Sequence, residues 1–277
     1  MRSVTLSSGE RVPALGIGTW RMGESRAARA EEIATLRLAI DLGATLIDTA
    51  EMYGEGATEA LVGEAISGRR DEIFLVSKVY PHNASRQGAA AACERSLLRL
   101  RTDRIDLYLL HWRGDVPLAE TLEAFLTLQQ QGKIRHFGVS NFDLGDMRDL
   151  WELPGARAVA TDQVLYNLTR RNVESALLPW LHERHIPIMA YSPLEQGRLV
   201  RHRELSALAR RDGMSPAQCA LAWLLSHDDV IAIPKSGSRE RLKENLGALD
   251  HALTPAQLLE LDRIFPRPAG VRPLEML

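Results

Sequence analysis

Four residues in the first half of the chain carry side chains suited to moving or stabilising a proton: Asp48, Tyr53, Lys78 and His111. A tyrosine with a pKa of ~10 is a poor acid at neutral pH, but a nearby ammonium such as Lys78 lowers that pKa by ~1 to 3 units. We expect Asp48 to pair with Lys78 and hold it in place. His111 can donate a hydrogen bond to a carbonyl oxygen and stabilise an alkoxide that forms there. The four residue types therefore predict an acid, a cation that lowers the pKa of that acid, a carboxylate that holds the cation and a hydrogen-bond donor that orients a carbonyl group.

Each of the four also has a purely structural interpretation. Asp48 could cap a helix, Lys78 could be a solvated strand end, and His111 could be a packing residue. Tyr53 could be an ordinary loop aromatic. Their joint placement at the ends of neighbouring predicted strands favours one common site over four unrelated roles.

Cationic and hydroxyl side chains follow the last predicted strand: Lys235, Ser236, Ser238 and Arg241. Backbone amides at the start of a helix favour an anion, and Ser238 could cap the helix that begins there. Lysine and arginine together suit the 2′-phosphate that distinguishes NADPH from NADH. The alternative is a solvated helix start, with Arg241 and Glu244 facing water.

An aromatic ring and three hydrogen-bonding side chains end the middle and later strands. Tyr191 could lie flat against a nicotinamide ring. Ser140, Asn141 and Gln163 offer a hydroxyl and two amides for the carboxamide group of that ring. The alternative is that Tyr191 packs at a rim and the other three are loop polar residues. No G-x-G-x-x-G segment opens a helix after a strand, so a Rossmann-type dinucleotide site is not predicted.

These residues lie at the carboxyl ends of eight short apolar segments that alternate with segments of helical period. The predicted strands span residues 14–18, 45–50, 73–78, 105–111, 136–141, 158–164, 186–192 and 230–235. Such alternation predicts βα units and a parallel sheet. The polar strand ends recur on average every 31 residues between Gly18 and Lys235, close to the length of one βα unit of ~30 residues. We predict an α/β fold, the (β/α)8 TIM barrel, in which all eight strand ends open on one face.

Two helix starts carry a capping box with a proline at the first helical position: Ser215-Pro216 with Gln218, and Thr254-Pro255 with Gln257. Residues 2–12 are typical of an N-terminal β-hairpin around Ser-Gly-Glu, which we expect to close the bottom of the barrel. No linker divides the chain, so residues 1–277 are predicted to form a single domain. Only the tail, residues 266–277, lacks a regular pattern.

The composition excludes several classes of partner. A formal charge of −2 over 277 residues gives no general attraction for nucleic acid or anionic membranes. No run of 18 apolar residues indicates a membrane helix, and the first residues do not resemble a secretion signal. Cys93 and Cys219 have no second cysteine or histidine at metal-ligand spacing. We expect a cytoplasmic protein that binds small molecules and no metal.

Eight segments, in this order, resemble those of the aldo-keto reductase superfamily: GIGTW, IDTAEMYG, VSKV, LLHW, GVSNF, DQVLYN, AYSPL and IPKSGSRERLKEN. They span residues 16–245. The resemblance implies a catalytic tetrad of Asp48, Tyr53, Lys78 and His111, and direct hydride transfer from NADPH without a metal. It implies a cofactor site made of Gly18, Thr19, Trp20, Ser140, Asn141, Gln163, Tyr191, Ser192, Leu194, Lys235, Ser236, Ser238, Arg241, Glu244 and Asn245.

The segments AEMYGEG, SKVYPHNAS and MAYSPLEQGRL are most similar to the bacterial branch that includes methylglyoxal reductases. This resemblance implies NADPH-dependent reduction of small aldehydes and ketoaldehydes by a monomer. The substrate residues expected from it are Trp20, Tyr53, Tyr80, His111 and Trp112. Short segments after His111 and Tyr191, and a short tail, predict an open barrel mouth that accepts many substrates.

Three other functions fit parts of the pattern. The barrel could hold its cofactor as a redox-sensing regulatory subunit, although an intact tetrad argues against binding alone. It could work in the oxidative direction as an alcohol or sugar dehydrogenase, because direction depends on cellular cofactor ratios. A barrel enzyme for phosphorylated sugars would leave Tyr53, Tyr191 and the Asp48–Lys78 pair without a role.

Overall fold

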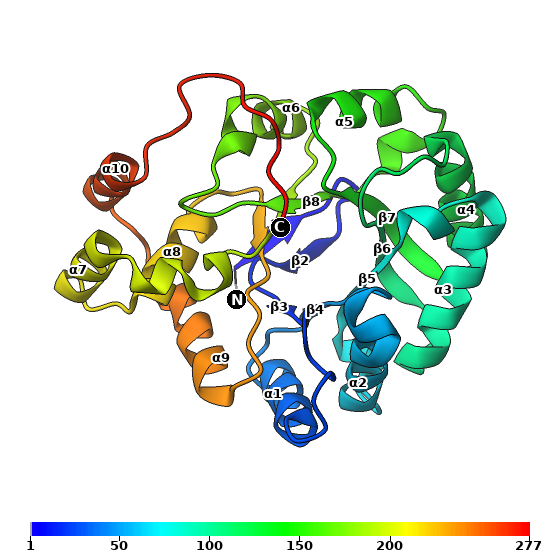
Figure 1. Cartoon of the computed structure of the whole chain (residues 1–277), viewed down its shortest axis with the longest axis horizontal. Coiled ribbons are helices and arrows are strands. Elements are labelled where there is room, and N and C mark those ends of the chain that lie inside the picture. The colour runs from blue at the N-terminus through cyan, green and yellow to red at the C-terminus, as the bar shows by residue number, and fades with distance from the viewer. Residues whose placement is uncertain (1) are drawn as a thin grey trace.

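The computed structural model describes residues 2–277, and in it eight parallel strands form the predicted (β/α)8 barrel (Figure 1). The barrel strands are β3 (Ile17–Gly18), β4 (Leu46–Asp48), β5 (Phe74–Val79), β6 (Ile105–Leu110), β7 (Ile134–Ser140), β8 (Asp162–Leu165), β9 (Ile188–Tyr191) and β10 (Val230–Ala232). Each strand pairs in parallel with the next along the chain. Bridges from Leu15 to Ala232 and from Gly18 to Lys235 join the first strand to the last and close the barrel.

The strands are apolar on both faces because both faces are covered. Every residue of β4, β5 and β6 is buried, since one face meets the barrel interior and the other meets the surrounding helices. Polar side chains therefore concentrate at the strand ends. Glycine permits a close approach between two strands: at Gly16, a Cβ would lie 2.8 Å from the Leu46 carbonyl oxygen of the neighbouring strand.

In the part of the chain that the structure describes, ten α-helices surround the barrel (Figure 1): α1 (Arg29–Asp41), α2 (Ala57–Ala65), α3 (Arg86–Leu100), α4 (Leu118–Gln130), α5 (Leu144–Trp151), α6 (Leu177–His182), α7 (Arg203–Arg211), α8 (Pro216–Leu225), α9 (Arg239–Leu246) and α10 (Pro255–Ile264). The two predicted capping boxes are present at the starts of α8 and α10. Ser238 is the residue before α9, but its hydroxyl donates to Glu240 Oε2 at 2.6 Å instead of capping the helix as expected. Within residues 2–277, no helix has both the length and the apolar character needed to cross a membrane.

The predicted N-terminal hairpin is confirmed as β1 (Ser3–Thr5) paired antiparallel with β2 (Arg11–Pro13). Val4 and Val12 are buried beneath the barrel, and the Ser7 hydroxyl donates to the Val159 carbonyl just before β8. These contacts are with the amino-terminal ends of the strands. The hairpin therefore closes the end of the barrel opposite to the polar strand ends.

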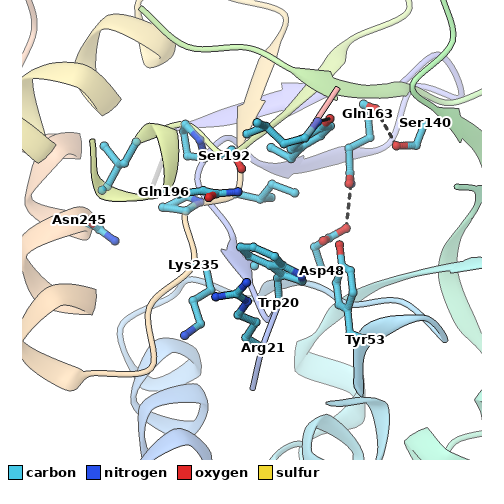
Figure 2. Close-up of a pocket in the computed structure, with 18 of the residues that line it drawn as sticks. Trp20, Arg21, Asp48, Tyr53, Ser140, Gln163, Ser192, Gln196, Lys235 and Asn245 are labelled. Atoms are coloured by element: carbon cyan, nitrogen blue, oxygen red, sulfur yellow. Dashed lines mark hydrogen bonds between the residues drawn. The ribbon is translucent and has the colours of Figure 1, made fainter. Parts of the chain in front are cut away.

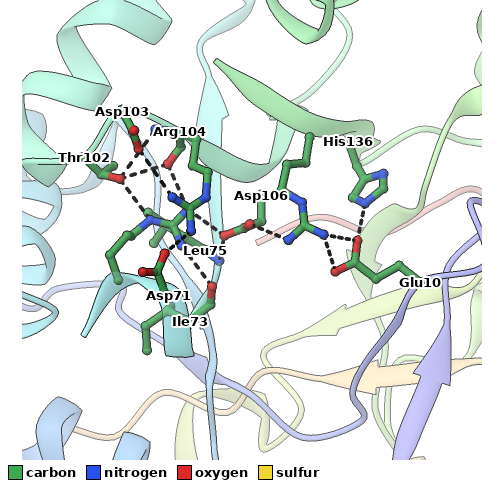
Figure 3. Close-up of polar contacts among 11 residues, drawn as sticks. Glu10, Asp71, Ile73, Leu75, Thr102, Asp103, Arg104, Asp106 and His136 are labelled. Carbon is green, nitrogen blue, oxygen red and sulfur yellow. Dashed lines mark hydrogen bonds and ion pairs between the residues drawn. The ribbon is translucent and has the colours of Figure 1, made fainter. Parts of the chain in front are cut away.

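A network of ion pairs, here called the floor network, braces this closed end (Figure 3). The Asp106 carboxylate, at the start of β6, accepts hydrogen bonds from Arg70 and from the Leu75 backbone amide through one oxygen. Its other oxygen accepts one from Arg135, which also donates to Glu10 of the hairpin loop. One buried carboxylate thereby links two neighbouring strands and, through Arg135, the hairpin.

The last residues return to the open end of the barrel. After α10, residues 266–277 cross the mouth and end near its centre, shown in red in Figure 1. We call this segment the C-terminal strap. The side chain of Glu275 pairs with Arg170, and the Asn172 amide donates to the Pro273 carbonyl.

Candidate active site

A cavity of about 870 Å³ opens at the carboxyl ends of the barrel strands (Figure 2). The sequence-predicted residues along its wall are Gly18, Trp20, Asp48, Tyr53, His111, Trp112, Ser140, Asn141, Gln163, Tyr191, Ser192, Leu194, Lys235, Arg241, Glu244 and Asn245. They come from all but one of the eight strand ends. In Figure 2, Asp48 and Tyr53 lie close to Gln163, whereas Asn245 lies at the opposite side of the cavity.

Three of the predicted catalytic residues form a chain of hydrogen bonds along one wall. The Lys78 ammonium donates to Asp48 Oδ2 and to the Thr49 carbonyl oxygen, each at 2.8 Å. It also donates to the Tyr53 hydroxyl at 3.2 Å. The second oxygen of Asp48 accepts from Gln163 Nε2 at 2.8 Å. The lysine is buried and fixed, and its third hydrogen bond ends on a hydroxyl that borders the cavity.

A tight turn places Tyr53 over the strand ends. β4 ends at Asp48, and Tyr53 begins a short 3₁₀ turn that runs into α2. Gly54, Glu55 and Gly56 in this turn all have left-handed backbone angles, with φ of 55°, 53° and 90°. Glycine adopts this conformation without a Cβ clash, so the Tyr-Gly-Glu-Gly sequence favours the sharp reversal. The reversal directs the tyrosine ring back towards the barrel axis.

Burial determines the direction in which the Tyr53 pKa moves. Desolvation raises the pKa of Tyr53 above its usual value, and Lys78 only partly opposes that rise. The lowering of the Tyr53 pKa that we expected from Lys78 is therefore wrong for the protein alone. Burial removes water that would stabilise the phenolate, and the Lys78 ammonium, which also pairs with Asp48, does not compensate for that loss. Burial also acts against the Lys78 ammonium, but Asp48 and Tyr53 outweigh it and raise the pKa of Lys78. Lys78 is thus charged and Tyr53 carries its proton at neutral pH.

His111 is a neutral ring at the base of the cavity. Burial and the positive charge of Lys78 lower the pKa of His111 to about 2. Its ring meets the Tyr53 ring edge-on, with centroids 5.9 Å apart, and lies 5.0 Å from the Trp112 ring. Among residues 2–277, His111 Nδ1 has no hydrogen-bond partner. A neutral imidazole can donate one N–H to a polar atom in the cavity without introducing a second charge beside Lys78.

The residues expected at a nicotinamide lie together beside this group. The Tyr191 hydroxyl donates to Asn141 Oδ1 at 2.9 Å, and Asn141 Nδ2 donates to the His111 carbonyl. The Ser140 hydroxyl donates to the Gln163 carbonyl at 2.8 Å. Asn141 has a left-handed backbone with a φ of 59°, which turns its side chain across the strand ends. These contacts fix the orientation of the Ser140 and Asn141 side chains and of the Tyr191 ring at the cavity wall.

Cations line the side of the cavity near β10 and α9. Lys235 and Arg241 are exposed there. Sequence reasoning missed two further lining cations, Arg21 and Arg201. The Arg21 guanidinium lies 4.3 Å from the centroid of the Trp20 ring, so it is held over an aromatic face at the cavity edge. In the sequence, Arg21 directly follows the GIGTW segment, and this position could have identified it as a cavity residue.

Five predicted residues lie outside the cavity wall: Thr19, Lys78, Tyr80, Ser236 and Ser238. Lys78 reaches the cavity only through Tyr53, whose hydroxyl accepts a hydrogen bond from the lysine ammonium. The Thr19 hydroxyl donates to the Asp48 carbonyl, and the Ser236 hydroxyl to the Ser238 carbonyl, so both are engaged by backbone. Tyr80 packs edge-on against Trp112, with ring centroids 5.8 Å apart, and supports that wall from outside.

The mouth is less open than the short loops predicted. Met276 and Leu277 of the C-terminal strap line the cavity, and the Leu277 amide donates to the Tyr191 hydroxyl at 3.3 Å. The segment after β9 contributes Gln196, Gly197 and other lining residues through two short 3₁₀ turns. An apolar Met-Leu pair at the end of a polar tail was the only local signal of this role.

Comparison with known proteins is consistent with this geometry. The Aldo/keto reductase family matches residues 14–265. Methylglyoxal reductase YeaE of Escherichia coli K12 is 48% identical, over 100% of this chain and 99% of that protein. Methylglyoxal reductase DkgB of Escherichia coli O157:H7 is 31% identical, over 86% of this chain and 87% of that protein.

Solved structures agree in fold along the whole chain. An aldo/keto reductase from Klebsiella pneumoniae, in complex with NADP and acetate, superimposes with a TM-score of 0.97 and is 48% identical, covering 100% of this chain and 99% of that one. The thermostable aldo-keto reductase Tm1743, in complex with the inhibitor epalrestat, has a TM-score of 0.89 and 39% identity, covering 95% of this chain and 100% of that one. From the matched motifs, the barrel and these relatives, the chain belongs to the aldo/keto reductase family.

Proposed function

We propose that this protein uses NADPH to reduce small aldehydes and ketoaldehydes to alcohols, with Tyr53 as the proton donor. The observation that carries the proposal is the hydrogen-bonded chain from Asp48 through Lys78 to Tyr53, which ends at the cavity beside a neutral His111. Two relatives are named methylglyoxal reductases, and structures from Klebsiella pneumoniae contain NADP or NADPH. These names support a small carbonyl substrate and a phosphorylated nicotinamide cofactor.

The cavity wall fits such a cofactor. Ser140, Asn141 and Gln163 offer hydrogen-bonding groups to a carboxamide, and Tyr191 offers a ring beside them. Lys235 and Arg241 would hold the 2′-phosphate at the other side, where charge-assisted hydrogen bonds are strong. When bound, NADPH supplies the hydride that is added to the carbonyl carbon.

Side chains of the protein then bind and protonate the carbonyl oxygen of the substrate. His111 donates a hydrogen bond that orients this oxygen and stabilises its developing negative charge. Tyr53 gives its proton to the oxygen, which completes the alcohol, and its phenolate is stabilised by the adjacent Lys78 ammonium. Asp48 keeps that ammonium charged and aimed at Tyr53. Trp20 and Trp112 form apolar walls that suit a small carbonyl compound.

A single substitution tests the acid. We would follow NADPH and then NADH absorbance with methylglyoxal for the wild type and for Tyr53→Phe, which removes one hydroxyl and keeps the ring. We expect NADPH consumption by the wild type and a fall of ~100-fold or more in the variant, because general acids commonly contribute 10²- to 10⁴-fold. Tyr108→Phe is a matched control, since the Tyr108 hydroxyl is buried in β6 and the residue does not line the cavity.

The outcomes separate the alternative functions. Full activity in Tyr53→Phe would disprove its role as the acid. A wild type that binds NADPH but consumes none with any small aldehyde would instead favour a cofactor-binding regulatory protein. Faster turnover of an alcohol with NADP⁺ than of its carbonyl with NADPH would favour a dehydrogenase.

A further inference from the structure

One guanidinium joins two segments that wall the cavity from different parts of the chain. Arg170, in the turn after β8, donates to Glu195 Oε1 through Nε at 3.1 Å and Nη2 at 2.9 Å. Its third nitrogen, Nη1, donates to Glu275 Oε1 at 2.5 Å. Glu195 belongs to residues 192–197, here called the β9 loop, and Glu275 belongs to the C-terminal strap. Arg170 itself does not line the cavity.

The β9 loop has a backbone that needs support. Ser192, Glu195 and Gln196 are non-glycine residues with left-handed φ angles of 48°, 50° and 53°. Such residues raise the free energy of a loop and persist only where surrounding contacts hold them. Ser192, Leu194, Gln196 and Gly197 of the same loop line the cavity. The loop is therefore a strained wall whose shape depends on its anchors.

The Glu195 carboxylate is the main anchor of that loop. Its side chain is only 5% exposed, and Asn167 donates to its second oxygen at 2.8 Å while also donating to the Ser192 carbonyl. Burial opposes the charged form, but Arg170 and Asn167 outweigh it and lower the pKa of Glu195. Arg198 also contacts Glu195, but its side chain is 62% exposed, against 31% for Arg170. Arg170 is thus the less solvated of the two cations that hold the loop.

The same guanidinium anchors the C-terminal strap near the proposed reaction centre. Glu275 precedes Met276 and Leu277, which line the cavity, and the Leu277 amide donates to the Tyr191 hydroxyl. The other polar contact of the strap nearby is exposed, from Asn172 to the Pro273 carbonyl. The Arg170–Glu275 pair therefore fixes the strap directly beside its cavity-lining residues.

We propose that Arg170 is a positioning residue that sets two walls of the cavity together: the β9 loop, through Glu195, and the C-terminal strap, through Glu275. This inference rests on the proposed function, which identifies the cavity as the site where NADPH and the carbonyl compound bind. An arginine is required because its planar fork presents donors to two carboxylates at once, whereas a lysine ammonium is a point charge. Loss of Arg170 releases two walls together, while loss of Glu275 releases only the strap.

The test compares three variants of the full-length protein: Arg170→Gln, Glu275→Gln and the control Arg198→Gln. NADPH binding is measured by fluorescence titration without substrate, and KM and kcat are measured with methylglyoxal. Hydrogen exchange is followed in the peptides that cover residues 192–197 and 266–277. Exchange and cofactor binding do not depend on turnover, so they report positioning separately from chemistry.

For Arg170→Gln we expect NADPH binding to be about tenfold weaker and KM about tenfold higher, because charged hydrogen bonds contribute at this level. The kcat should stay within about threefold of the wild-type value, because no reacting group is lost. Exchange should rise in both peptides. Glu275→Gln should raise exchange in the strap alone, and it should weaken NADPH binding and raise KM less than Arg170→Gln does, because the β9 loop keeps its anchor. Arg198→Gln should change NADPH binding, KM and exchange by less than about twofold, because the Arg198 side chain is largely exposed to solvent and its ion pair with Glu195 contributes little.

Two results would overturn the inference. One is unchanged exchange in both peptides of Arg170→Gln; the other is unchanged NADPH affinity and KM despite increased exchange. If the wild type reduces no carbonyl compound, yet Arg170→Gln still binds NADPH more weakly and frees both segments, the proposed function fails while the positioning role of Arg170 stands.

Discussion

Two buried carboxylates at opposite ends of the barrel illustrate how the same interaction serves different purposes. At the closed end, both oxygens of Asp106 are saturated by Arg70, Arg135 and a backbone amide (Figure 3). At the open end, Asp48 is equally saturated, but its partner Lys78 has a further hydrogen bond to Tyr53, which borders the cavity. Both pairs have short, well-formed contacts.

The difference lies in what the cation touches next. Arg135 continues to Glu10 of the hairpin loop, so the closed-end network links one structural element to another. Lys78 continues to a hydroxyl that can lose a proton to a bound molecule. Under the proposed function, the ion pair at the open end takes part in the reaction because its cation reaches a titratable group at the cavity, in line with the general rule that barrel enzymes react at the carboxyl ends of their strands.

The largest effect expected from this comparison is on activity at the open end. Lys78→Met removes the charge that stabilises the Tyr53 phenolate, and we expect kcat for methylglyoxal to fall by about 10²- to 10⁴-fold. NADPH consumption measures the effect, and Lys133→Met, which removes a half-buried lysine paired with Glu94 away from the cavity, is the control.

Removal of Lys78 also leaves Asp48 buried without its cation, which destabilises the fold. Thermal unfolding and NADPH titration must therefore show that the variant is folded at the assay temperature. A folded Lys78→Met protein with more than a tenth of wild-type activity would contradict the distinction between the two pairs.

The next effect is on stability at the closed end. Asp106→Asn leaves Arg70 and Arg135 without a shared counter-charge, and we expect the free energy of unfolding to fall by roughly 2–3 kcal/mol, reduced from the fully buried case because Arg135 is half exposed. Urea unfolding measures it. Asp71→Asn, at an exposed ion pair with Arg104, should leave the stability close to that of the wild type.

For the folded Asp106→Asn protein, kcat/KM should remain within about twofold of wild type, because the hydrogen bonds that the structure gives Asp106, Arg70 and Arg135 reach no residue that lines the cavity. A loss of activity much larger than this, measured well below the unfolding temperature, would show that the two ends are coupled.

The smallest effect concerns a third buried carboxyl group, which has no cation. Within residues 2–277 neither oxygen of Asp162 has a hydrogen-bond partner, and burial raises the pKa of Asp162 well above its usual value. The folded protein therefore holds the Asp162 proton to a higher pH than the unfolded chain does. Because the unfolded state binds fewer protons, stability falls as pH rises above about 4.

Asp162→Asn removes this pH-dependent loss. We expect a gain of roughly 1–3 kcal/mol in the free energy of unfolding at pH 8, the range for a buried group that lacks partners, shrinking towards pH 4. Urea unfolding across pH 4–8 measures it, with Asp103→Asn as an exposed control. A constant difference at all pH values would show that ionisation of Asp162 is not its cause.

Sequence patterns were sufficient where the physics is local. The capping boxes at Ser215 and Thr254 were predicted correctly because such a box is made by residues three apart. The gathering of Asp48, Lys78 and His111 at one mouth was predictable because parallel strands with short connections bring every carboxyl end to the same side. The catalytic and cofactor roles of these residues remain predictions until the variants are measured.

The tertiary structure alone decided features that depend on distant contacts and on burial. It pairs Leu15 with Ala232 to close the barrel, and it brings Leu277 to Tyr191, which no local pattern encodes. It also reversed the expected direction of the Tyr53 pKa shift. The sequence places Lys78 near Tyr53, but only the folded chain shows how much water is excluded from the phenol, and this desolvation outweighs one ammonium charge.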